Sequence, residues 1–80
     1  MSHVPHELGE EFPEHAETMH RLKLEDAHFV NLAEKYHEVN RAVHRAETDI
    51  EPTSDEHMTE MRKQRAYLKD EIAAILAKHA

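Results

Sequence analysis

Apolar residues recur at alternating steps of three and four along two long parts of the chain. The first series is Phe29, Leu32, Tyr36, Val39, Val43, Ala46 and Ile50. The second series is Met58, Met61, Arg65, Leu68, Ile72, Ile75 and His79, in which Arg65 and His79 are polar residues at the same spacing. Such spacing is typical of α-helices that pack along a shared seam. Because Pro52 cannot continue a helix, the pattern predicts two helices, at about 26–49 and 55–78, joined by a turn at 50–54. The expected fold is all-α, an antiparallel, coiled-coil-like two-helix hairpin.

The register of this hairpin follows from matching the two seams around the turn. With Ile50 opposite Met58, Tyr36 falls opposite Ile72, and Val43 opposite Arg65. The flanking positions then pair Glu47 with Arg62, Asn40 with Lys69 and Lys35 with Glu71. Oppositely charged flanking pairs fix register and partner in coiled coils. The alternative is ordinary surface charge spaced along each helix, with no meaning across the seam.

Residues 1–25 form a separate N-terminal segment that we expect to be partly helical. Pro13 suits a first helical turn, and Asp26 is a candidate N-cap for the helix that follows, with a kink before it. Since neither Pro nor Gly occurs from Glu14 to Glu51, one continuous helix from Glu14 is the alternative. The second long helix is expected to be capped by Thr53 or Ser54, and Thr53 would complete a capping box with Glu56.

The small size of the chain limits its core. Its 80 residues contain no Cys, and domains this small usually need a staple or a partner. The run Ile72–Ala77 is apolar on nearly every face, so something must cover it: either the N-terminal segment or a second copy. We expect a homodimer, or an unknown protein partner, with the interaction surface at Phe29, Arg65, Ile72, Ile75 and Leu76. The stem of Arg65 is expected to cover the seam while its head reaches Glu47 or solvent.

Charge and hydropathy exclude two classes of partner. The net charge is −7, with 17 acidic and 10 basic residues, and this balance repels a phosphate backbone. The longest apolar stretch, Ile72–Ala77, is much shorter than the roughly 20 residues of a membrane-spanning helix. No signal-peptide pattern is found near Met1. We therefore expect no nucleic-acid or membrane partner and a cytoplasmic location.

Nine histidines are the residues most suggestive of chemistry. His37 and His44 lie two helical turns apart, too far to share an ion, and Glu34 and His37 are expected to point to water. Ser54 and Asp55 are better explained as cap residues than as hydrolase residues. We thus predict no catalytic residue, metal site, cofactor or small-molecule substrate, and no enzymatic activity. A histidine-rich protein that responds to metal or pH, by titration near pH 6.5, is the alternative.

Several short motifs carry a resemblance to a known family. They are His3–Leu8, Asp26–Phe29, Tyr36–Arg41, Glu51–Asp55 and Leu68–Ile72. Together the motifs resemble those of the small bacterial YdcH-like proteins, a domain of unknown function. The resemblance implies a long helical hairpin in the cytoplasm and supplies no activity, ligand or catalytic residue. The function expected from the sequence is a non-enzymatic module for protein interaction and self-association.

Overall fold

The structure is a computed structural model that describes residues 6–48 and 54–79. Its elements are α1 (Leu8–Glu11), the 3-10 helix η1 (Pro13–His15), α2 (Ala16–Glu25), α3 (Ala27–Glu47) and α4 (Asp55–His79). The described residues contain no strand, and the prediction of an all-α protein is confirmed. Of the predicted turn at 50–54, residues 50–53, with Ile50, Pro52 and Thr53, lie outside the described residues.

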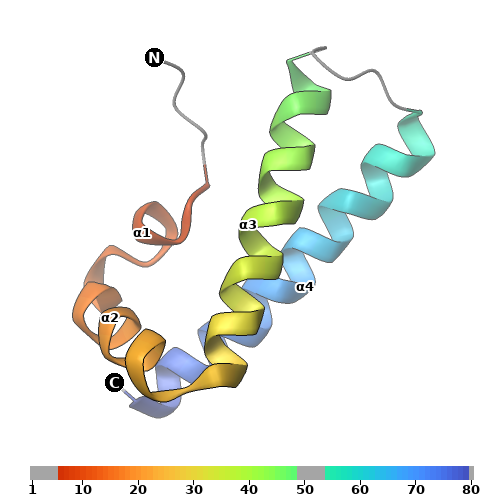
Figure 1. The fold of residues 1–80 in the computed structure, drawn as a ribbon. Coiled ribbons are helices and arrows are strands. Elements are labelled where there is room, and N and C mark those ends of the chain that lie inside the picture. The colour runs from red at the N-terminus through yellow and green to blue at the C-terminus, as the bar shows by residue number, and fades with distance from the viewer. Residues whose placement is uncertain (1–5, 49–53, 80) are drawn as a thin grey trace.

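Helices α3 and α4 pack on each other more extensively than any other pair of elements. In Figure 1 the end of α3 and the start of α4 lie at the same end of the molecule, and the helices meet lower down. Tyr36 and Ile72, which the register placed opposite each other, belong to one buried cluster and are both 0% exposed. Arg62 Nη2 donates to Glu47 Oε2 at 2.9 Å, as predicted. We call α3 and α4 together the helix pair.

Local capping explains where the two long helices begin. Asp26 is non-helical, with φ −127° and ψ 102°, and its Oδ1 accepts from His28 N at 2.9 Å and Phe29 N at 3.2 Å. This is the predicted N-cap, and the helix from Glu14 is therefore interrupted rather than continuous. For α4, Ser54 Oγ accepts from His57 N at 3.1 Å. A side-chain cap of this kind satisfies an N–H group that has no partner within the helix.

The N-terminal residues 6–25, which we call the arm, fold back along the helix pair (Figure 1). Helix α2 packs on both α3 and α4, and the arm contributes three buried side chains, Leu8, Met19 and Leu22, to the shared cluster. The arm therefore completes the core within one chain. Of the two coverings considered for the apolar end, the structure shows the N-terminal segment.

This packing shows where the residues of the predicted interaction surface lie within one chain. Phe29 and Ile72 are 0% exposed and Leu76 is 1% exposed within the single chain, while Ile75 packs against the same cluster and is partly buried. The arm covers this end of the helix pair within the described chain, and the predicted contact of these residues with a second copy or another protein stays a prediction. Among residues 6–48 and 54–79, the large apolar side chains that are exposed are Leu24 and Tyr67.

Candidate functional site

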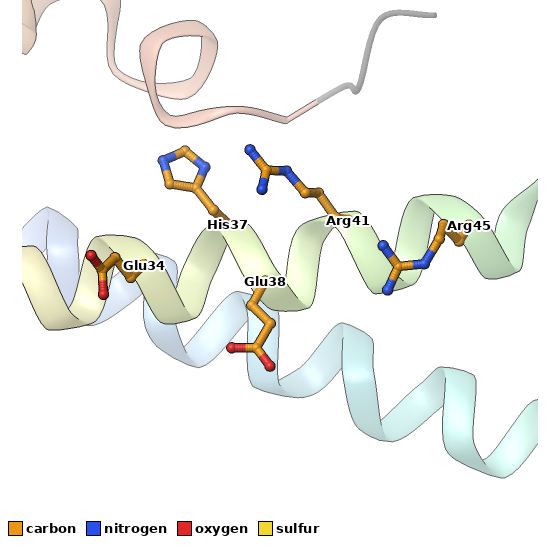
Figure 2. A pocket seen from close by; sticks show the side chains of 5 residues that line it. All are labelled: Glu34, His37, Glu38, Arg41 and Arg45. Carbon is orange, nitrogen blue, oxygen red and sulfur yellow. The ribbon is translucent and has the colours of Figure 1, made fainter.

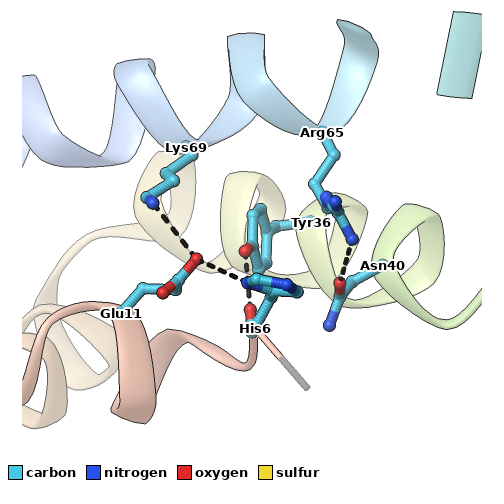
Figure 3. A network of polar contacts seen from close by, with 6 residues as sticks. All are labelled: His6, Glu11, Tyr36, Asn40, Arg65 and Lys69. Carbon is cyan, nitrogen blue, oxygen red and sulfur yellow. Dashed lines mark hydrogen bonds and ion pairs between the residues drawn. The ribbon is translucent and has the colours of Figure 1, made fainter. Parts of the chain in front are cut away.

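The candidate site is a polar junction where the arm meets the middle of the helix pair. It consists of six residues that Figure 3 shows converging from α1 and its preceding turn, from α3 and from α4: His6, Glu11, Tyr36, Asn40, Arg65 and Lys69. The sequence places them at this point because Leu8, 3% exposed, anchors the arm in the core between His6 and Glu11. A buried anchor flanked by polar side chains thus fixes the register of the arm.

Tyr36 is the centre of this junction. Its ring is 0% exposed, and its hydroxyl donates to the backbone carbonyl of His6 at 2.6 Å. Burial, followed by the charge of Glu11 and to a lesser degree that of Glu7, raises the pKa of Tyr36 to about 12, while the charge of Arg65 opposes the rise. His6 has a left-handed backbone, φ 64°, a conformation that costs about 1–2 kcal/mol for a residue with a side chain. The bond from Tyr36 helps to hold it there.

A shared carboxylate links the arm to α4. Glu11 Oε1 accepts from Lys69 Nζ at 3.1 Å and lies 3.1 Å from His6 Nδ1. Burial raises the pKa of Glu11, but the hydrogen bonds and charges of Lys69 and His6 outweigh it, so the pKa is lowered overall. The predicted neighbour of Lys69 was Asn40. The arm, whose position the seam pattern did not specify, brings a carboxylate to Lys69.

Arg65 and Asn40 form the second polar link of the junction. Arg65 Nη1 donates to Asn40 Oδ1 at 3.0 Å, and Asn40 is 1% exposed. The head of Arg65 was predicted to reach Glu47 or solvent; Glu47 pairs instead with Arg62, one turn away. The expected partial burial of Arg65 at the seam is observed. A buried amide opposite a guanidinium ties α3 to α4 at one register, because shifting either helix would leave Asn40 without this donor.

His37 makes a further contact with the arm. Figure 2 shows His37 and Arg41 directed from α3 towards the N-terminal segment, in a shallow cleft of about 430 Å³ that Glu34, Glu38 and Arg45 also line. His37 Nδ1 lies 2.6 Å from Glu7 Oε2. Sequence reasoning placed His37 in water. The acidic stretch Glu7–Glu11 opposite the cationic positions of α3 and α4 is the signal that could have indicated this contact.

A second cleft opens on the side of the helix pair away from these arm contacts. This seam groove measures about 390 Å³ and is lined by Lys35, Glu38, Val39, Ala42, His57, Met61 and Gln64. Val39, Ala42 and Met61 are only partly buried. The groove therefore presents an apolar floor with polar and charged edges.

The structure also bears on Ser54, on metal sites and on membrane spans. Ser54 acts as a cap, and its Oγ accepts from the backbone of His57. Within residues 6–48 and 54–79, no group of three or more His, Cys, Asp or Glu side chains is arranged to hold a metal ion. No helix in the described part of the chain combines the length and apolar content needed to cross a membrane.

Comparison with known proteins bears on the helix pair most directly. The family model described as a protein of unknown function (DUF465) matches residues 29–76, which start in α3 and end in α4. The uncharacterized protein YdcH of Escherichia coli K12 is 32% identical over 65 residues, covering 81% of this chain and 88% of the relative, and that of Shigella flexneri gives the same values. No solved structure matches the chain. These two matches show that the chain belongs to the DUF465 family of small proteins of unknown function, as its motifs had indicated.

Proposed function

We propose that this protein is a non-enzymatic helical module that acts by protein–protein contact, including contact with itself. In this proposal α3 and α4 form an antiparallel, coiled-coil-like hairpin, and its seam groove receives a further helix. The pair Glu47 with Arg62 supports this arrangement, because it joins the two helices in the predicted register. The bond from Arg65 to Asn40 joins the same two helices a second time.

The seam groove is the observation that carries the proposal. On the other side of the helix pair, the arm covers the core with Leu8, Met19 and Leu22. On the groove side, Val39 and Met61 remain partly exposed. An apolar strip between two helices is the surface on which an amphipathic helix docks through residues spaced three and four apart. Lys35 and Glu38 at the edge offer both signs of charge to such a helix.

The proposal is tested by placing a photo-cross-linking amino acid at Met61 in the cell that makes the protein. Adducts are expected from position 61, and Ala42→Lys should abolish them by putting a charge on the groove floor. The matched control is Lys63, which is exposed on the same helix and faces the opposite way, since two residues turn a helix by about 200°. An adduct of twice the chain mass identifies a second copy, and any other mass a different protein. Position 61 giving no adduct beyond those of position 63 would contradict the proposal.

A further inference from the structure

The junction between α2 and α3 is one residue long and almost helical already. Asp26 N donates to Leu22 O at 2.8 Å, and Val30 N donates to Asp26 O at 3.1 Å. Both bonds join residues four apart, as in an uninterrupted helix. The break therefore consists of the extended backbone of Asp26 and its side-chain bonds to His28 N and Phe29 N. No Pro or Gly between positions 14 and 47 prevents the two helices from joining.

The buried faces of α2 and α3 are in phase across this junction. The buried side chains in question are Met19, Leu22, Phe29, Ala33, Tyr36, Asn40 and Val43. Their spacing follows steps of three and four throughout, with Asp26 at the one position between Leu22 and Phe29. If Asp26 became helical, these side chains would form one continuous stripe on a single helix. That stripe would need a covering, since the arm would no longer fold back over α3 and α4.

We propose that two copies of this chain exchange their arms. In each copy α2 and α3 join into one helix at Asp26, and the arm packs on the helix pair of the other copy. A second copy is the occupant that supplies the same anchor, Leu8, and the same polar partners, so every contact of the closed arm is remade between chains. Such exchange of an identical element is a low-cost route to dimers. It also makes Phe29, Ile72 and Leu76 a contact between copies, as the sequence indicated.

The arm contacts make the exchange observable. Glu11 and Lys69 lie in contact at 3.1 Å, one in the arm and one in α4. Their link runs within a chain when the arm is closed and between chains when it is exchanged. Glu47 and Arg62, in contact at 2.9 Å, both belong to the helix pair, so their link stays within one chain in either form. Because the chain has no Cys, cysteine pairs at these positions are unambiguous.

The test compares Glu11→Cys/Lys69→Cys with Glu47→Cys/Arg62→Cys, both treated with a short bis-maleimide over a range of protein concentrations. Arm exchange predicts covalent dimers on a denaturing gel from the first pair, increasing with concentration, and intrachain links from the second. Asp26→Ala removes the cap and should raise the association constant of the dimer, measured by sedimentation equilibrium. Two caps are lost per dimer, so roughly a 10- to 30-fold increase is expected. Asp26→Asn keeps a capping side chain and should leave the constant near that of the unmodified chain.

The inference rests on the self-association part of the proposed function, and the outcomes separate the two. A dimer whose Glu11–Lys69 links all lie within one chain overturns arm exchange and leaves self-association through the seam groove. A monomer at every concentration, Asp26→Ala included, overturns arm exchange and self-association together. Far-UV circular dichroism on each variant confirms that it is folded before its links are assigned.

Discussion

Raising the pH should release the arm by ionising Tyr36. In the folded chain the Tyr36 hydroxyl donates to His6 O at 2.6 Å, and a phenolate cannot make that bond. Burial, followed by the charges of Glu11 and Glu7, raises the pKa of Tyr36 to about 12. The ordinary value in an unfolded chain is near 10. The folded-state pKa is the higher one, so this contribution to stability is complete below pH 10 and is lost between pH 10 and about 12.

The size of the effect follows from the difference between the two pKa values. A shift of two units corresponds to about 3 kcal/mol of unfolding free energy. A chain of this length has a total stability on the order of 4–12 kcal/mol, so the loss is a substantial fraction. The Tyr36 residue is 0% exposed, but the bond of its hydroxyl to His6 is only partly buried, so solvent screening makes about 3 kcal/mol an upper value.

The assay uses the chain with Tyr67→Phe, which leaves Tyr36 as the single tyrosine. Phenolate absorbance at 295 nm should rise well above pH 10, together with a fall in helicity and in the urea midpoint. Lysine side chains also lose their protons in this range, so Tyr36→Phe supplies the background loss of stability. The reasoning is refuted if Tyr36 titrates near pH 10. It is also refuted if the Tyr67→Phe and Tyr36→Phe chains lose the same unfolding free energy between pH 10 and 12.

Three further changes test the core, the shared carboxylate and the cap, all by urea unfolding. Ile72→Ala should cost about 2–5 kcal/mol, whereas Leu24→Ala, at a side chain 77% exposed, should stay within about 0.5 kcal/mol; equal losses would contradict the observed core. Glu11→Gln should cost about 1 kcal/mol or less at pH 7. Because the pKa of Glu11 is lowered, its contribution is present above the ordinary value and is lost as the pH falls through the folded-state pKa. The two chains should therefore converge as the pH falls below the ordinary value, and a gap that stays constant down to acid unfolding would refute the assignment. Ser54→Ala should cost about 1 kcal/mol, and no change would mean that the cap is dispensable.

The sequence was sufficient for features that depend on near neighbours. The cap at Asp26 depends on residues two and three positions away, and the pair Glu47 with Arg62 depends on a register fixed by two long seams. Asn40 shows where this reasoning stops. The seam pattern assigned it to a flank, yet it is 1% exposed, and Arg65 of α4 donates to its Oδ1. The contact of Lys69 with Glu11 was missed because the seam pattern did not place the arm.

The arm itself could not be placed from its own pattern. Its apolar residues are few, and Pro13 separates α1 from α2. Its position is set by one buried anchor, Leu8, and by contacts between residues 30 or more positions apart, such as Tyr36 with His6 and Lys69 with Glu11. Contacts of this kind leave no periodic signal in the sequence.

The closed and exchanged forms of the arm have the same core contacts and differ only at the hinge, Asp26. Substitutions in the core and at the hinge should therefore have different effects. A flexible linker would hold the arm near its own helix pair at an effective concentration on the order of millimolar, and this would favour the closed form. Here the linker between the two helices is Asp26 alone, so the conformation of this residue decides between the closed and exchanged forms. Leu22→Ala removes a buried side chain once per chain in either form. It should therefore lower the unfolding free energy by about 2–5 kcal/mol, which is seen as a lower urea midpoint. The association constant of the dimer should stay unchanged. Asp26→Ala should do the reverse, with a small effect on the midpoint and a large one on dimerisation. A dimerisation constant that follows Leu22 and ignores Asp26 would show that apolar area, and not the hinge, decides which form the chain adopts.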